Sequence, residues 1–328
     1  VDNRGLIESD ASAFDTGVVA RGSNYGLTNG GTGVIDGLIG MRVLGEDGRV
    51  ANFGVIGTAA SSDGMIIGGN PAEATSGFFL ANFGVIEGRF TAVLLRSNAD
   101  ENAMRNEGVI RAAEGPAIHG DGVTEGSIFR IVNGVDGVIE GGLLADEEYV
   151  SAMQFDAGRQ FVRNSGLIEG NVELGAEDDV FIQDHAGDVT GSVRGGGGDD
   201  QIVMNGADDV LSGEAGGDVL RAGAGDDRIF GGTGDDFIFD GAGNDEMHGG
   251  EGVDRFVYEG ADATAVDRIV DFEDDVDILN LAGAGLSGRG SALLRMSTDV
   301  NGDTTLTLDN GAQLVIEGIS AADLYDDL

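Results

Sequence analysis

Cysteine, tryptophan and lysine are absent from the 328-residue chain, and proline occurs only twice. Without cysteine, the protein has neither disulfide bonds nor thiolate metal ligands. No apolar run reaches the roughly 18 residues of a membrane-spanning helix, so we expect no membrane insertion. The sequence begins without a basic segment followed by an apolar stretch, so no Sec-type signal peptide is predicted. Disulfide-stapled and membrane-spanning folds are thereby excluded.

Basic residues are scarce as well. The chain has 59 acidic residues and 18 basic ones, all of them arginine, for a net charge of −41. Residues 1–171 hold 23 acids and 11 arginines, whereas residues 172–328 hold 36 acids and 7 arginines. A packed domain with such an excess of acid repels itself unless cations neutralise it. We therefore exclude nucleic acid as a partner and expect cations in the C-terminal half.

Glycine is abundant, at 60 positions, and it recurs at regular intervals. Residues 195–257 divide without gaps into seven rows of nine residues, which read GGGGDDQIV, MNGADDVLS, GEAGGDVLR, AGAGDDRIF, GGTGDDFIF, DGAGNDEMH and GGEGVDRFV. The sixth residue of every row is Asp, and the eighth is apolar. An array of this kind predicts a solenoid built from stacked repeats.

The composition of a row indicates how it folds. Glycine adopts positive φ at little cost, so the first six residues can form a tight turn. The remaining residues can form a short strand whose eighth side chain points inward. If two rows make one coil, equivalent turns stack on every second row, and Asp carboxylates and turn carbonyls form oxygen cages that suit Ca²⁺. We expect several Ca²⁺ ions as the cofactor.

The candidate calcium ligands are the row aspartates and the turn glycines. They are Asp200, Asp209, Asp218, Asp227, Asp236, Asp245, Asp254, Gly196, Gly198, Gly216, Gly223, Gly225, Gly232, Gly234, Gly241, Gly243, Gly250 and Gly252. In the row 204–212, Met204 and Asn205 replace the paired glycines, so we expect the weakest site there.

This row pattern resembles the RTX (hemolysin-type) calcium-binding repeat, GGxGxDx followed by an apolar residue and x. The match is close over 195–257. Residues 174–182 and 186–194 resemble degenerate rows, the second with Gly191 where Asp belongs. The resemblance implies a calcium-binding parallel β-roll over 172–257.

The C-terminal segment, 258–328, is expected to form a short β cap. Residues 267–281, DRIVDFEDDVDILNL, are similar to the segment that follows RTX rows in type I-secreted proteins. Residues 304–320 predict two strands joined by a turn at Asn310-Gly311. The last residues, Asp326-Asp327-Leu328, resemble the end of an uncleaved type I secretion signal. The resemblance implies export from a Gram-negative bacterium without an N-terminal signal peptide, followed by folding in extracellular or cell-surface calcium.

A looser repeat, Asn-x-Gly-apolar-Ile, runs through residues 1–171. It starts at Asn3, Asn52, Asn82, Asn106 and Asn164, and it recurs without Asn at that place from Gly33 and Gly137. Its glycines are 21 to 30 residues apart, which predicts the coils of a parallel β-helix. Asn tolerates the left-handed region and can also stack as a ladder of amides. The unit resembles those of β-helical surface proteins and adhesins, and a β-sandwich of repeated hairpins stays open as the alternative.

The predicted fold class is therefore all-β. We expect a parallel β-helix, or solenoid, over 1–171, a calcium-binding parallel β-roll over 172–257 and a short C-terminal β cap over 258–328.

Catalytic motifs are missing. Neither HExxH nor GxSxG occurs, so a zinc protease and an α/β-hydrolase are excluded. The three histidines, His119, His185 and His248, are far apart in sequence. A minimal site made of Arg111, His119, Arg130 and Tyr149 stays open on a β-helix face. We expect no enzyme but a structural protein; the alternative is a secreted carbohydrate-active β-helix enzyme, of the lyase or epimerase type, with an RTX module.

The expected partners are calcium, further copies of the chain and a cell-surface polysaccharide. The first repeat unit starts at Asn3 with no amphipathic helix before it, so we expect an open β-helix edge there. Such an edge favours end-to-end self-association into a surface layer, matrix, filament or fibre.

Overall fold

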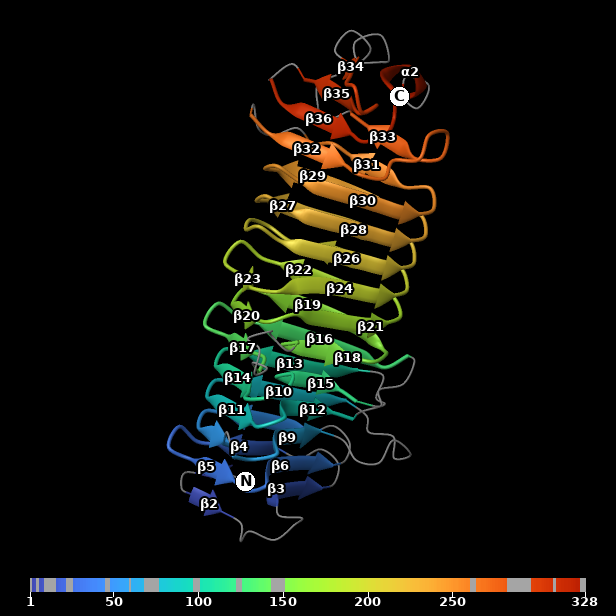
Figure 1. The fold of residues 1–328 in the computed structure, drawn as a ribbon. Helices are drawn as coiled ribbons and strands as arrows, with labels where there is room; N and C mark the ends of the chain where they lie inside the picture. The colour runs from blue at the N-terminus through green and yellow to red at the C-terminus, as the bar shows by residue number, and fades with distance from the viewer. Residues whose placement is uncertain are drawn as a thin grey trace. The chain divides into compact units, whose positions relative to one another are not determined.

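The computed structural model describes residues 2–324 except 4–5, 9–15, 22–25, 45–47, 59, 68–76, 97–100, 122–125, 143–150, 260–263, 282–295 and 309–310. The described chain is built mainly of β-strands, as Figure 1 shows. It forms two compact units, Val1–Ser192 and Val193–Leu328, and each is treated separately below. Among the described residues, no helix has the length and apolar character needed to cross a membrane.

The N-terminal unit is a parallel β-helix in which each coil adds one strand to each of three sheets. Sheet A contains β1 (Asp2–Asn3), β4 (Gly26–Asn29), β7 (Arg49–Asn52), β10 (Phe78–Asn82), β13 (Asn102–Asn106), β16 (Ile128–Asn133), β19 (Arg159–Asn164) and β22 (Val180–Gln183). Sheet B contains β2 (Leu6–Glu8), β5 (Val34–Asp36), β8 (Val55–Ile56), β11 (Val85–Gly88), β14 (Val109–Ala112), β17 (Val138–Glu140), β20 (Leu167–Glu169) and β23 (Asp188–Val189). Sheet C contains β3 (Thr16–Arg21), β6 (Ile39–Leu44), β9 (Asp63–Ile67), β12 (Thr91–Leu95), β15 (Ile118–Gly120), β18 (Met153–Phe155) and β21 (Val172–Ala176).

The coils stack in register, so equivalent side chains form columns. In sheet B the repeat isoleucine of one coil pairs with that of the next, as at Ile86 and Ile110. The column Ile35, Ile56, Ile86, Ile110, Ile139 and Ile168 is at most 1% exposed. Every strand pair recorded in this unit is parallel, as Ile110 with Ile139 illustrates. The β-helix prediction is confirmed, and the β-sandwich alternative is wrong.

Asparagines at the ends of the sheet A strands from β4 to β19 form a ladder along the corner between sheets A and B. Each side-chain amide donates to the amide oxygen of the next coil: Asn29 to Asn52, Asn52 to Asn82 and Asn82 to Asn106 at 2.8 Å, then Asn106 to Asn133 and Asn133 to Asn164 at 2.9 Å. These six side chains are fully buried. The predicted amide ladder is confirmed.

Two details of the ladder differ from the sequence prediction. The units at Gly33 and Gly137 do have ladder asparagines, Asn29 and Asn133, four residues before the glycine instead of two. The longer turn hides the motif without changing the position of the amide. The ladder asparagines also do not adopt the left-handed backbone: among the described non-glycine residues, positive φ occurs at Glu177, Glu214 and Asp275. Asn is required here for its amide hydrogen bonds.

The C-terminal unit alternates its rows between two parallel sheets. The first roll sheet contains β25 (Gln201–Val203), β27 (Val219–Ala224), β29 (Phe237–Ala242), β31 (Arg255–Val257) and β33 (Ile278–Asn280). The second roll sheet contains β24 (Ser192–Gly197), β26 (Val210–Ala215), β28 (Arg228–Thr233), β30 (Glu246–Glu251), β32 (Val266–Ile269), β36 (Gln313–Ile316), β35 (Thr304–Thr307) and β34 (Met296–Thr298).

Two rows make one coil, as predicted, because Gln201 pairs with Val219, 18 residues later. The eighth residue of each row points into the core. The set Ile202, Leu211, Leu220, Ile229, Ile238, Met247 and Phe256 is at most 2% exposed. The core of this unit is therefore a thin stack of single apolar layers.

The end of the chain closes the second roll sheet. Strands β35 and β36 are antiparallel, as the sequence predicts, and β36 pairs in parallel with β32. Strand β34 and the short helix α2 (Ala321–Leu324) are additional elements that the sequence did not indicate. The hairpin residue Asn310 and the terminal Asp326-Asp327-Leu328 lie outside the described residues.

Candidate calcium-binding ladder

The sixth-position aspartates of the rows form a buried ladder. All seven predicted aspartates are at most 2% exposed. From the second coil onward, the Oδ1 atom accepts a hydrogen bond from the backbone N–H of the aspartate one coil earlier. The pairs are Asp200 N to Asp218 at 2.7 Å, Asp209 N to Asp227 and Asp218 N to Asp236 at 2.8 Å, Asp227 N to Asp245 at 2.9 Å, and Asp236 N to Asp254 at 3.0 Å.

The second oxygen of these carboxylates has no such partner. Oδ2 is buried and without a hydrogen bond in Asp218, Asp227, Asp236, Asp245 and Asp254. In alternate rows it lies directly against the first glycine of its own row: a Cβ added at Gly213 or Gly231 would overlap Oδ2 of Asp218 or Asp236. A buried acceptor without a donor is costly, and a bound cation removes that cost. This orphaned oxygen is what a Ca²⁺ ligand requires.

The turn glycines bring the backbone carbonyls of stacked turns close together. All eleven predicted glycines have φ between 100° and 143°. At Gly234, a Cβ would also overlap the carbonyl oxygen of Gly216 in the preceding coil. Glycine is thus needed here for the backbone conformation and for the close approach of the stacked turn. The second position of one row has Glu214 instead, held at φ 76°.

The donors for a cation therefore include main-chain atoms. Within the described part of the chain, no three His, Cys, Asp or Glu side chains converge as a metal site made of side chains alone would require. Carboxylate and carbonyl oxygens together match the ligand preference of Ca²⁺, a hard cation that takes oxygen ligands. The row aspartates and the turn carbonyls fit this ion.

The row 204–212 has a different turn. Asn205 and Ala207 stand where the other rows have left-handed residues, and neither has positive φ. Asp209 nevertheless keeps its place in the ladder, with its N–H donating to Asp227. The turn of this row therefore lacks the positive φ angles that the neighbouring rows share. That its calcium site is weaker stays a prediction.

Burial raises the pKa of the ladder carboxyls. The values are about 6 for Asp218, Asp227 and Asp254, about 7 for Asp236 and about 8 for Asp245. The main cause is desolvation; neighbouring carboxylates raise the pKa further, and the backbone hydrogen bond to Oδ1 partly offsets both. Without a cation, the folded ladder thus disfavours its own charged form.

The ladder extends beyond the predicted rows. The N–H groups of Asp245 and Asp254 donate to Asp267 Oδ1 at 3.0 Å and Asp277 Oδ1 at 2.9 Å. Residues 262–270 and 272–280 keep Asp at the sixth position and an apolar residue at the eighth, but they lack the glycines. The Asp–x–apolar spacing was the signal that could have revealed them.

A degenerate row in the N-terminal unit has the same local geometry. In LGAEDDVFI, Gly175 and Glu177 have positive φ, and buried Asp179 accepts from Gln160 N at 2.7 Å. The sequence identified this row as degenerate only because its glycines are incomplete. Its turn is nonetheless that of the regular rows.

A second, exposed ladder was missed. At the fifth position of the rows, Asp199 Oδ1 accepts from Gly217 N, Asp208 from Asp226 N and Asp235 from Val253 N, each at 2.9 Å. These bonds run in the opposite direction from those of the sixth position. The row pattern leaves the fifth position undefined, so no feature of the motif singled it out.

An additional carboxyl is buried at the first position of one row. Asp240 is 1% exposed, and its Oδ1 accepts from Gly241 N at 2.6 Å and Glu259 N at 2.8 Å. Burial raises its pKa to about 7. Burial and the nearby carboxylates, Asp267 first among them, also raise the pKa of Tyr258. The equivalent residue two rows earlier is Ala222, so this acid is not required by the turn.

The comparisons with known proteins agree with this geometry. Residues 205–238 and 221–256 match the family model described as the RTX calcium-binding nonapeptide repeat (4 copies). The matched segments contain every predicted row aspartate except Asp200. A search of curated proteins found no relative that matches the chain.

Proposed function

We propose, from the premise that residues 205–256 are RTX calcium-binding nonapeptide repeats, that this chain is an extracellular structural protein whose C-terminal unit folds when Ca²⁺ binds. RTX repeats are typical of extracellular proteins secreted by the type I route. This proposal rests on one observation: the Oδ2 atoms of successive ladder aspartates are buried and have no hydrogen-bond donor.

The physical basis is the coupling of metal binding to folding. A bound Ca²⁺ would supply positive charge and coordinate the carboxylate oxygens that receive no hydrogen bond from the protein. The chain's own residues arrange those oxygens: glycines hold the turns, and each Asp Oδ1 is fixed by the N–H of the previous coil. Binding free energy of this kind is folding free energy. Low cytosolic calcium would keep the unit unfolded for export, and higher calcium outside would fold it.

We propose further that the protein has no catalytic function and serves by self-association or by attachment to a surface layer, matrix or fibre. Three of the four residues of the minimal glycan-acting site lie on different sheets: Arg130 on sheet A, Arg111 on sheet B and His119 on sheet C. Outward side chains of three sheets cannot face one substrate. The fourth, Tyr149, lies outside the described residues.

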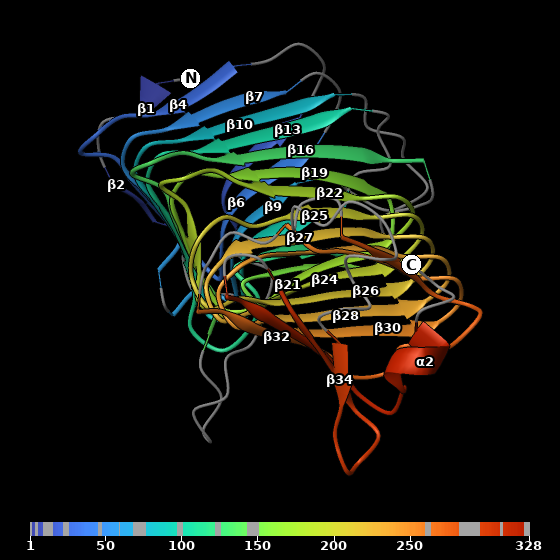
Figure 2. The same cartoon turned by 90° about the horizontal axis from the view of Figure 1, so that it is seen from above.

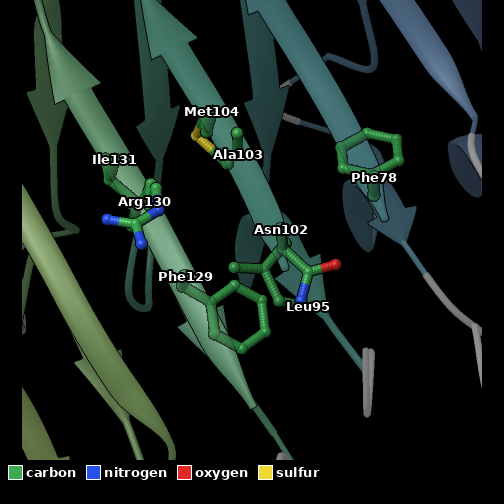
Figure 3. A pocket seen from close by; sticks show the side chains of 8 residues that line it. All are labelled: Phe78, Leu95, Asn102, Ala103, Met104, Phe129, Arg130 and Ile131. Atoms are coloured by element: carbon green, nitrogen blue, oxygen red, sulfur yellow. The ribbon is translucent and has the colours of Figure 1, made fainter. Parts of the chain in front are cut away.

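The pocket beside Arg130 does not favour catalysis either. Its volume is about 10 Å³, which holds about one water molecule. Figure 3 shows that its lining is mainly apolar, with Phe78, Phe129 and Ile131 among the side chains. Arg130 instead lies over the ring of Phe161, 4.7 Å from its centroid.

The test is folding of the whole chain by far-UV circular dichroism. In excess EGTA the β signal of the C-terminal unit should be lost, and millimolar Ca²⁺ should restore it. Millimolar Mg²⁺ is the control, because it demands octahedral geometry and releases water reluctantly. An unchanged spectrum in EGTA would contradict calcium-dependent folding. Light scattering in the same two conditions tests association: strictly monomeric protein in Ca²⁺, at tens of micromolar, would contradict the self-assembly part alone.

A further inference from the structure

Sheet A of the N-terminal unit has an unusual outward face for so acidic a protein. Its seven strands from β4 to β22 contain no Asp or Glu. They contain five arginines, out of the 11 in residues 1–171: Arg49, Arg105, Arg130, Arg159 and Arg163. Figure 2 shows these strands side by side. Nearly half of the arginines in residues 1–171 thus lie on one sheet.

The register places four of these arginines, all but Arg159, in two outward columns. One column runs Arg49, Phe79, Ala103, Arg130 and Phe161, one residue per strand. The other includes Ala81, Arg105, Val132 and Arg163. Sheet B is the opposite: its outward column contains Glu87, Glu140 and Glu169, with Arg111 between acids. The strands of sheet A, taken without their turns, therefore carry a charge opposite in sign to that of the chain.

The arginines of sheet A differ in their partners. In the described residues, Arg105, Arg159 and Arg163 pair with acids in adjacent turns, whereas Arg49 and Arg130 have no ion-pair partner there. Arg130 is held over Phe161, and Phe79 is 41% exposed. Figure 3 shows Arg130 and Ala103 on neighbouring strands of this face. Guanidinium groups bind carboxylates in bidentate geometry, and an exposed aromatic ring offers an apolar platform.

The face is also regular. The buried asparagine ladder ties consecutive strands at its edge, and side-chain ladders are what keep many-stranded sheets flat. Strands are about 4.8 Å apart, so Arg49 and Arg130, three strands from each other, are separated by about 14 Å. A surface with evenly spaced groups suits a linear polymer with a repeating carboxylate.

We propose that the outward face of sheet A, with Arg49, Phe79 and Arg130 at its centre, binds a linear acidic polysaccharide. Its carboxylates pair with the two arginines, and a sugar ring lies on Phe79. Charge complementarity selects this partner over a neutral glycan. The first roll sheet also pairs an arginine with an aromatic ring, because Arg255 lies over Phe237 at 4.6 Å. This face belongs to a different unit from the calcium ladder.

The experiment measures binding of short oligogalacturonate and oligomannuronate to the full chain by calorimetry in millimolar Ca²⁺. Methyl-esterified oligogalacturonate of equal length is the uncharged control. We expect binding of at least one acidic oligomer, weakened by salt, and none of the ester. The Arg49→Gln/Arg130→Gln double variant should lose about tenfold or more in affinity, whereas Arg111→Gln on sheet B should stay within about twofold.

Four results would overturn the proposal. The first is that neither acidic oligosaccharide binds, and the second is that the ester binds equally well. The third is an equal loss of affinity in Arg111→Gln. The fourth is that the wild-type protein self-associates and that this assembly dissociates in the double variant. The last result would mean that a second copy occupies the face. Unchanged thermal unfolding of the double variant verifies its fold; if it does not fold, Phe79→Ala, which removes only the platform, must weaken binding instead. The variants lie outside the calcium ladder, so failure here leaves calcium-dependent folding untouched.

Discussion

The two units solve the same stacking problem with different side chains. In the N-terminal unit, a buried asparagine from each coil donates to the next, as Asn82 does to Asn106 at 2.8 Å. In the C-terminal unit, a buried aspartate from each coil accepts from the backbone of the previous one, as Asp236 does from Asp218 N at 2.8 Å. Both ladders lie inside the fold, and both repeat with the coil.

The difference is one of donors. An amide has both an acceptor oxygen and two N–H donors, so each ladder asparagine can also bond backbone carbonyls, as Asn52 does to Gly54 and Val85. A carboxylate only accepts, so Oδ2 of Asp236 is left without a donor and beside like charges. The asparagine ladder is therefore complete by itself. The aspartate ladder lacks such donors, and in the proposed function a bound Ca²⁺ takes their place.

The largest expected difference between the two units is the pH dependence of their stability in the absence of calcium. The raised pKa values of Asp218 and Asp245, about 6 and about 8, lie above the 3.8 of an unburied Asp. Protonation therefore stabilises the folded ladder below about pH 4, and this stabilisation is lost as the pH rises through 6 to 8. In EGTA, circular dichroism should show more folded C-terminal unit at pH 5 than at pH 8.

With calcium the dependence reverses, because the ligands must be deprotonated. The calcium midpoint should fall as the pH rises from 5 to 8. The asparagine ladder does not titrate, so the N-terminal unit should show neither trend. An EGTA sample that is equally unfolded at both pH values would show that protonation cannot replace the cation.

Asn106→Asp should be the most destabilising single substitution, because it replaces an amide of the asparagine ladder with a carboxylate. The new carboxylate cannot donate to Asn133 Oδ1, and it is buried without a cation. The N-terminal unit should lose about 3 kcal/mol or more of stability, and calcium should not restore it. Urea unfolding in Ca²⁺ measures this. Asn171→Asp is the matched control, because Asn171 uses its oxygen as the acceptor for Ser192 N and should tolerate a carboxylate; equal costs would refute the donor argument.

Within the aspartate ladder, the quality of the row should set the strength of the site. Asp236→Ala removes a predicted ligand that follows the left-handed Gly232 and Gly234, whereas Asp209→Ala acts in the row without such glycines. We expect the calcium midpoint to rise about tenfold in the first variant, about 1.4 kcal/mol, and less in the second. Calcium titrations followed by circular dichroism decide this, and equal midpoints would contradict it.

The smallest expected effect concerns Asp240, the buried acid that the turn does not require. Asp240→Asn keeps the oxygen that accepts from Glu259 N and replaces the orphaned Oδ2 with a donor. The calcium-loaded unit should gain about 1 kcal/mol in urea unfolding at pH 8. Destabilisation of that size would mean that Asp240 holds a cation or a proton that the fold needs.

Both ladders are largely predictable from sequence, because residues one coil apart along a solenoid stack directly on each other. The constant nine-residue spacing, with two rows per coil, predicts that Asp236 stacks on Asp218 and that Ile238 belongs to the core, and both predictions are confirmed. The Asn-x-Gly unit likewise predicts the amide ladder at Asn52, Asn82 and Asn106. Local motifs that repeat once per coil are the part of such a fold that sequence reveals directly.

The remaining features depend on contacts that the motif does not encode. A turn two residues longer concealed Asn29 and Asn133, although their amides occupy the same place. Loss of glycine concealed Asp267 and Asp277, because the ladder bond requires only the carboxylate and the stacked N–H. The arginine face was missed because its residues come from strands 20 to 30 positions apart, with no shared motif.

Hydrogen–deuterium exchange of the whole chain, with calcium and with EGTA, tests whether only the aspartate ladder depends on calcium. It reports separately on the amides of residues 201–257, which include the Asp218 N–H, and on those of residues 102–139, where Asn106 and Asn133 lie. In EGTA, the amides of residues 201–257 should exchange at the rate of unfolded chain, whereas those of residues 102–139 should stay protected. Calcium should restore the protection of residues 201–257. Continued protection of residues 201–257 in EGTA, or equal loss of protection in both groups, would contradict this prediction.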